Sequence, residues 1–151
     1  MLRSFCILSL MTIACLCLVA CGGGRKVADV EGVVKINGQP AEKIRIQFWP
    51  EKEGPRSQGV TNAEGRFTLT TEDNTGPGAA IGPNKITLLD LEVYGGGKIV
   101  GRAAEDTDLS QGKKSRINLT YNSPNTSGLS KEVEAGKKNE FEFDVKPLGG
   151  K

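Results

Sequence analysis

The chain has 151 residues, of which 37% are hydrophobic, 25% charged and 5% aromatic, with a formal net charge of +2. This length suits one domain plus a targeting segment, and a charge so close to zero argues against nucleic acid as a partner. The sequence has no histidine, the commonest general base and transition-metal ligand, so most hydrolase mechanisms are disfavoured and we expect no metal or cofactor. Twenty glycines and seven prolines favour a turn-rich β protein.

Residues 1–20 have the pattern of a secretory signal peptide. Arg3 provides a basic start, and the stretch from Phe5 to Ala20 is uncharged. The alternative is an uncleaved membrane helix, because an uncharged run of this length is at the lower limit for crossing a bilayer. Cleavage would remove three of the four cysteines, which are Cys6, Cys15 and Cys17.

The segment Leu18-Val19-Ala20-Cys21 resembles the bacterial lipobox. The resemblance implies cleavage before Cys21, a diacylglyceryl thioether on its sulfur and acylation of the new amino group. Acyl chains of this kind hold a protein on a membrane. The lipidated cysteine and Gly-rich tether at 21–26 would keep the domain close, since the five residues after Cys21 reach at most about 18 Å. We expect a membrane-anchored lipoprotein of the cell envelope, facing the periplasm or the cell surface.

The mature domain, residues 27–146, is predicted to be all-β. Apolar and polar residues alternate in most of its predicted strands, which cover 27–36, 44–49, 59–61, 66–70, 84–89, 117–121, 129–133 and 140–146. Asn37-Gly38 is a strong signal for a hairpin turn. The pattern predicts an antiparallel two-sheet sandwich of about seven strands, followed by a flexible tail at 147–151.

Several motifs of this domain resemble the carboxypeptidase regulatory-like family. They are Val30-Glu31-Gly32-Val33-Val34 before the Asn37-Gly38 turn, Thr61-Asn62-Ala63-Glu64-Gly65-Arg66-Phe67, and Ile81-Gly82-Pro83-Asn84-Lys85-Ile86. The second has Asn62 where the family has Asp, and the third has Asn84 where the family has Tyr. The resemblance implies a transthyretin-like (prealbumin-like) sandwich.

The segment from Tyr121 to Leu129, Tyr-Asn-Ser-Pro-Asn-Thr-Ser-Gly-Leu, is similar to one in small planctomycete-type lipoproteins of this family, where it leads into the last hairpin. Transthyretin-like enzymes, the hydroxyisourate hydrolases, use histidines and a C-terminal Tyr-Arg-Gly-Ser motif. This chain has neither, so no catalytic residue is carried over from the family.

Three side chains are candidate contacts for a ligand or partner. Trp49 is out of phase with the apolar face of its strand, so it either stays exposed for stacking or packs beneath the charged loop 51–58, the arrangement we favour. Segment 90–115 is too long for an ordinary structureless connection. It is either a structural hairpin, a mobile insertion or a binding surface, and in the last case Tyr94 and Ile99 are the contacts to test.

Two charged clusters are weaker candidates. Glu105, Asp106 and Asp108 are able to bind a hard cation but lack the spacing of an EF-hand, so a solvated acidic loop is the preferred interpretation. The run Lys113-Lys114-Ser115-Arg116 is interpreted as a solvated turn, with a polyanion site as the alternative.

The sequence therefore predicts a non-enzymatic, lipid-anchored envelope protein with a structural, adhesive or partner-binding role. Its partners are the membrane, through the acyl chains on Cys21, and another envelope protein or a polysaccharide. One alternative is a carbohydrate-binding surface module, which needs Trp49 and Tyr94 exposed on one face. A hydrolase is the less favoured alternative, because it needs a nucleophile and base among Ser, Lys, Asp and Glu.

Overall fold

The computed structural model describes residues 27–74, 76–94 and 114–149. The predicted signal peptide, Cys21, the tether, Ile99 and the acidic cluster at 105–108 lie outside the described residues. Among those that are described, no helix has the length and apolar character needed to cross a membrane.

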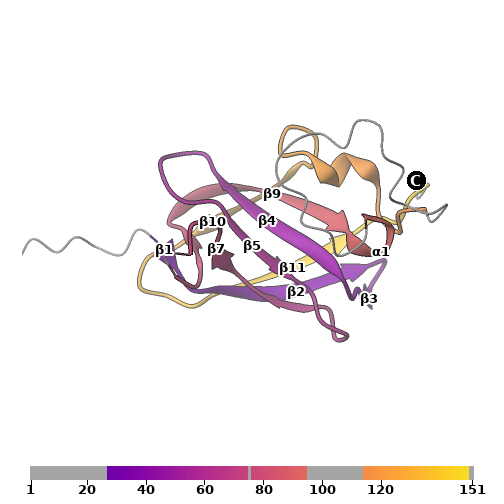
Figure 1. Cartoon of the computed structure of the whole chain (residues 1–151), viewed down its shortest axis with the longest axis horizontal. Coiled ribbons are helices and arrows are strands. Elements are labelled where there is room, and N and C mark those ends of the chain that lie inside the picture. The colour runs from indigo at the N-terminus through magenta and orange to yellow at the C-terminus, as the bar shows by residue number, and fades with distance from the viewer. Residues whose placement is uncertain (1–26, 75, 95–113, 150–151) are drawn as a thin grey trace, which may run out of the picture.

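The described chain forms an all-β sandwich, as predicted (Figure 1). The five-stranded sheet has the order β10-β9-β4-β5-β7, with bounds Leu129–Val133, Gly82–Asp90, Ile44–Pro50, Ser57–Val60 and Thr70–Thr71. The four-stranded sheet has the order β11-β2-β3, with β6 also paired to β2, and its bounds are Asn139–Val145, Val30–Ile36, Gln39–Pro40 and Arg66–Thr68. A separate pair joins β1 (Val27–Ala28) to β8 (Ala79–Ala80). Seven of these strands have three residues or more, in agreement with the predicted number.

The last two long strands do not form a hairpin, and in this respect the sequence-based prediction is wrong. Strand β10 pairs with β9 in one sheet, whereas β11 pairs with β2 in the other. The β2–β11 ladder is parallel and runs from Asn139 opposite Val30 to Val145 opposite Ile36, while every other described ladder is antiparallel. The turn after β10 therefore carries the chain from one sheet to the other.

The core lies between the two sheets and is built from the apolar face of each long strand. Phe143 is at its centre, with ring centroids 6.4 Å from Phe48 and 6.2 Å from Phe67. These aromatic pairs join β11 and β6 of one sheet to β4 of the other. Burial of the alternating residues confirms the period-2 interpretation of the strands.

Residues 117–121 are not a strand, contrary to the prediction. Ile117 makes only an isolated bridge to Pro147, and the chain then forms the 3₁₀ helix η1 (Leu119–Asn122). The Asn118 side chain accepts a hydrogen bond from the Thr120 backbone N–H at 3.0 Å, which favours the helical turn over a strand. Leu119 consequently faces solvent and is 51% exposed.

The beginning of the predicted tail and the beginning of segment 90–115 show local order. Leu148 donates its backbone N–H to the Arg116 carbonyl at 3.0 Å, so the beginning of the predicted tail is bonded to the rest of the fold. A one-turn helix, α1 (Leu91–Tyr94), follows β9 directly. It lies at the end of the sandwich opposite β1 (Figure 1).

Candidate functional site

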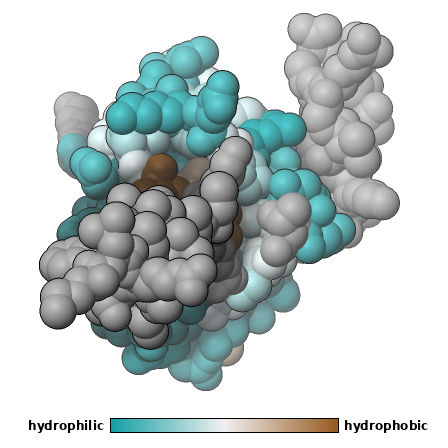
Figure 2. All heavy atoms as spheres, turned by 90° about the vertical axis from the view of Figure 1, so that its left-hand side faces the viewer, coloured by the Kyte–Doolittle hydropathy of each residue, from teal (hydrophilic) through white to brown (hydrophobic). Residues whose placement is uncertain are grey.

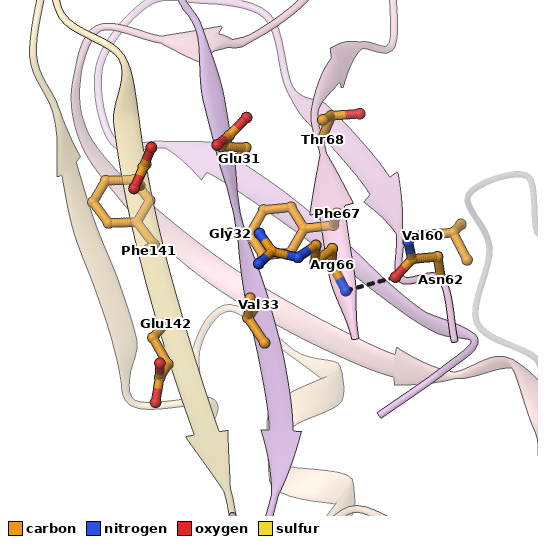
Figure 3. A pocket seen from close by; sticks show the side chains of 11 residues that line it. Glu31, Gly32, Val33, Val60, Asn62, Arg66, Phe67, Thr68, Phe141 and Glu142 are labelled. Atoms are coloured by element: carbon orange, nitrogen blue, oxygen red, sulfur yellow. Dashed lines mark hydrogen bonds between the residues drawn. The ribbon is translucent and has the colours of Figure 1, made fainter. Parts of the chain in front are cut away.

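A shallow groove of about 580 Å³ lies on the outer face of the four-stranded sheet (Figure 3). Its floor is formed by three neighbouring strands, β11, β2 and β6, and one side is formed by the last residue of β5 and the turn that follows it. The lining side chains include Glu31, Val33, Arg66, Thr68, Glu140 and Glu142. Val60, which is 48% exposed, and Asn62 complete the side next to β5.

The strand register sets the pattern of charges in the groove. Glu31 on β2 lies between Glu140 of β11 and Thr68 of β6. Two residues further along β2, Val33 lies between Glu142 and Arg66. Because alternate residues of a strand point to the same face, these side chains face solvent while their chain neighbours enter the core.

The groove carboxylates are paired with lysines at its margins. Lys138 places its Nζ 2.8 Å from Glu31 and 3.6 Å from Glu140. Lys35 Nζ lies 2.7 Å from Glu142. The hydrogen bond from Lys138 holds the pKa of Glu31 below its usual value, and the same contact raises the pKa of Lys138.

Arg66 is a groove cation whose charge helps to lower the pKa of Glu31, although the two side chains form no direct ion pair. Its side chain is exposed and extends from β6 across the sheet toward β2 (Figure 3). The backbone beneath it is fixed by the predicted turn: Asn62 Oδ1 accepts hydrogen bonds from the N–H groups of Glu64 at 3.1 Å and Arg66 at 2.9 Å. Gly65 has φ +71°, as the turn requires.

The groove is bordered by a strand edge, that of β11, which has no partner strand in the part of the chain that the structure describes. The Asn139 N–H donates a hydrogen bond to the Asp29 carbonyl, and the Val145 carbonyl accepts one from the Asn37 N–H. These two residues of β11 therefore direct their backbone groups toward β2. Successive residues of a strand direct their backbone N–H and C=O groups to opposite edges. The N–H and C=O groups of Glu140, Glu142 and Asp144 therefore point away from β2. No described strand lies along that edge.

Trp49 lies outside this groove, on the other sheet. Its Nε1 donates a hydrogen bond to Thr87 Oγ1 at 3.0 Å, and the Arg56 guanidinium lies 4.7 Å from the ring centroid. Arg56 belongs to the charged loop 51–58, so Trp49 packs against that loop, as in the favoured interpretation. Tyr94 ends α1, but its side chain, like the whole of Ile99, is not described.

The basic run at 113–116 is not a solvated turn throughout. Arg116 forms an ion pair with the fully buried Asp90, at 2.7 Å from Nη2 to Oδ1. Ser115 is also buried, and its hydroxyl donates a hydrogen bond to the Ile117 carbonyl. Charge alone indicated a surface cluster, and no sequence signal paired Arg116 with an aspartate 26 positions earlier.

Asn84 and Asn139 are buried polar residues that the sequence analysis did not select. Asn84 donates to the carbonyls of Ala80 and Gly82, which fixes the bend before β9. Asn139 accepts a hydrogen bond from the Glu134 N–H at 2.9 Å and orders the turn before β11. Both asparagines hold turns in place, so their contribution is to the shape of the surface rather than to chemistry.

The described residues contain no group of three His, Cys, Asp or Glu side chains suited to a metal ion. Comparison with family models, curated proteins and solved structures gives no match. The resemblance to the carboxypeptidase regulatory-like family therefore rests on its motifs alone.

Proposed function

We propose that this chain is a non-enzymatic, lipid-anchored envelope protein whose β-sandwich binds an extended segment of another envelope component. The anchor is Cys21, acylated after removal of residues 1–20. The partner-binding surface is the groove on the four-stranded sheet together with the open edge of β11. A transthyretin-like sandwich, implied by the sequence motifs, is part of the same proposal.

The edge of β11 that no described strand pairs, beside the groove, is the observation that carries the binding proposal. A seven-residue strand with outward-directed N–H and C=O groups offers a template for one more strand. A strand added to this edge would place alternate side chains over Glu140 and Glu142, next to the rest of the groove. Backbone bonds would supply affinity, and the side chains in the groove would supply selectivity.

The electrostatics of the groove support binding rather than hydrolysis. Acid–base catalysis by carboxylates needs one group whose pKa is raised toward neutrality. Glu31, the carboxylate opposite the Thr68 hydroxyl in the ladder, has its pKa lowered by Lys138 instead. It is therefore ionised at neutral pH and is a weak base for activating that hydroxyl.

The position of Trp49 does not favour a carbohydrate site. Stacking on a sugar ring needs an open indole face. In this structure the Arg56 guanidinium covers one face, and the indole N–H is already bonded to Thr87.

The anchor is tested by expressing the full chain in bacteria and measuring the mass of its N-terminal peptide. We expect a triacylated or diacylated peptide beginning at Cys21, with the protein in the membrane fraction. Cys21→Ala should leave the chain unacylated. A wild-type chain with an unmodified Cys21 would overturn the anchor.

The binding surface is tested with a photo-crosslinking residue placed in intact cells at Thr68, in the groove, or at Ser130. Both are exposed strand positions, but Ser130 lies on β10 in the opposite sheet. We expect a recurrent protein adduct from position 68, absent from position 130. Glu142→Pro should abolish it by removing an outward N–H, while Glu142→Gln, which keeps that N–H, should not. Equal adducts at both positions would refute this surface.

A further inference from the structure

The end of the sandwich where the described chain begins contains a hollow of about 480 Å³. Its lining combines apolar residues with three charged ones: Val27, Ala28, Ile81, Ala135 and Gly136, together with Asp29, Lys137 and Lys138. Figure 2 looks at this end of the molecule and shows apolar atoms at the surface, next to neutral and hydrophilic ones. Ile81 is 36% exposed, so an apolar side chain is presented to solvent beside the β1–β8 pair.

The walls of the hollow are held by hydrogen bonds. Asn139 Nδ2 lies 3.2 Å from the carbonyl oxygens of Asp29, Glu134 and Lys137, which fixes the turn that carries Ala135. On the other side, the Asn84 amide donates to the Ala80 carbonyl at 2.8 Å and so fixes the backbone next to Ile81. The hollow is therefore a preformed feature of the fold.

The length of the tether determines what can cover this end. Val27 lines the hollow, and only five residues separate it from Cys21, a reach of at most about 18 Å. Strand β9, with nine residues, is by itself about 30 Å long. With the acyl chains in a bilayer, the tether is short enough for the β1 end to rest on the lipid surface. If the long axis of the sandwich points away from the membrane, α1 and η1 lie at the far end, beyond the reach of the tether (Figure 1).

The chemistry of this end suits the boundary between lipid headgroups and acyl chains. An apolar side chain such as Ile81 gains from leaving water there, and lysines keep their ammonium groups among the headgroups. Lys137 and Lys138 form exposed ion pairs, with Glu134 and with Glu31. The groove on the four-stranded sheet is different, because its lining includes the three carboxylates of Glu31, Glu140 and Glu142, which would lose hydration against lipid. The hollow, rather than the groove, is thus the surface suited to the membrane.

We propose that this hollow docks on the bilayer surface, so that the sandwich stands end-on, with Ile81 in the lipid interface and the groove accessible from the side. This rests on the lipid anchor proposed above. It assigns a membrane-contact role to Ile81 and to the 134–138 turn, and it places Leu119 on the membrane-distal end.

Site-specific labelling tests this orientation. Acylation of Cys21 leaves the mature chain without a free thiol, so Ile81→Cys or Leu119→Cys introduces a single one. Both residues are exposed apolar side chains. Ile81 lies between β8 and β9, and Leu119 lies in η1 at the opposite end of the molecule (Figure 1). The full acylated chain, carrying an environment-sensitive fluorophore, is reconstituted in phosphatidylcholine–phosphatidylglycerol vesicles containing headgroup spin-labelled lipid. We expect several-fold stronger quenching at position 81 than at position 119, and equal quenching would overturn the docking.

Four further measurements complete the test. A label at Ala135→Cys, an independent position in the hollow, should reproduce the quenching, and adding Ile81→Asp should reduce it several-fold while the acyl chains keep the protein on the vesicles. If the fluorophore at position 81 reports the same apolar environment in the unacylated Cys21→Ser chain without lipid, the tether itself fills the hollow and the docking is refuted. If mass analysis shows that Cys21 carries no lipid, the anchor and the docking both fail, whereas an acylated chain with unquenched position 81 refutes the docking alone.

Discussion

Arg116 donates hydrogen bonds to both carboxylate oxygens of Asp90, with Nε 3.0 Å from Oδ2 and Nη2 2.7 Å from Oδ1. The Arg116 backbone N–H donates to the same carboxylate at 2.8 Å, and its Nη2 also donates to the Glu42 carbonyl. Asp90 is fully buried at the end of β9, just before α1. The pair therefore joins the end of the five-stranded sheet to the segment that leads into Ile117.

Replacing Arg116 with Met should destabilise the fold markedly, because it leaves the Asp90 carboxylate buried without a cation. We expect the free energy of unfolding to fall by about 3 kcal/mol, at the lower end for breaking a buried pair, since the Arg116 side chain is 39% exposed. Urea denaturation measures this. Lys114→Met removes a neighbouring exposed charge and should cost less than about 0.5 kcal/mol, so equal losses would contradict the role of the pair.

The same pair should make stability depend on pH at the acid end. Burial raises the pKa of Asp90, but the hydrogen bonds and charge of Arg116 outweigh this and bring it below its usual value. Since the folded pKa is lower than the unfolded one, the contribution is complete above the unfolded value of about 3.9 and disappears as pH falls through the folded pKa. In urea titrations, the stability difference between wild type and Asp90→Asn should shrink below about pH 4. A constant difference would refute the assignment.

The strands and tight turns were predictable because their signals are local. Alternation in 44–49 correctly placed Ile44, Ile46 and Phe48 in the core. Asn37-Gly38 adopts positive φ at both residues, +51° and +78°, and closes the β2–β3 hairpin as expected. In each case the residue's own stereochemistry, or the parity of its neighbours, determines the outcome.

The pairing of the last two strands depends on contacts that the sequence does not encode locally. Alternation shows which side chains of 139–145 are buried, but it is equally compatible with either sheet. The parallel ladder with 30–36 joins positions more than a hundred residues apart. It depends on the fit of Phe141 and Phe143 into the core, which no neighbouring residue reveals.

The candidate site was predictable only in part for the same reason. Trp49 was a candidate contact because it is the sole tryptophan of the sequence. Its environment, however, depends on Arg56 in the following loop. The groove brings together Glu31, Arg66 and Glu142, which come from three separate strands; Arg66 and Glu142 are exposed and Glu31 is half-buried. Their proximity follows from the order of the strands in the sheet, so no local sequence motif predicts it.

Gly32 allows β2, β6 and β11 to come close together, and its replacement should be costly. A Cβ at this position would lie 2.0 Å from the Phe141 carbonyl oxygen and 2.8 Å from the Phe67 ring. We expect Gly32→Ala to lower the free energy of unfolding by about 3 kcal/mol, since a backbone atom must move. Gly128→Ala is the control: its Cβ meets open space and only its φ of +66° is unfavourable, a cost of about 1 kcal/mol. Urea denaturation measures both variants. If Gly32→Ala lowered the free energy of unfolding by less than Gly128→Ala, the close approach at Gly32 would not be the cause.

Thr61 connects the start of β4 to the turn after β5 through its buried hydroxyl. The Thr61 Oγ1 donates to the Ala41 carbonyl at 2.6 Å and accepts from the Ile44 N–H at 2.9 Å. Thr61→Val keeps the shape but leaves both backbone groups unsatisfied, so the free energy of unfolding should fall by about 2 kcal/mol. Thr61→Ser keeps the hydroxyl and should recover most of that loss. Amide hydrogen exchange provides an independent measurement: Ile44 should lose protection in the Val variant and keep it in the Ser variant. Unchanged protection in both variants would show that the hydroxyl does not hold this junction.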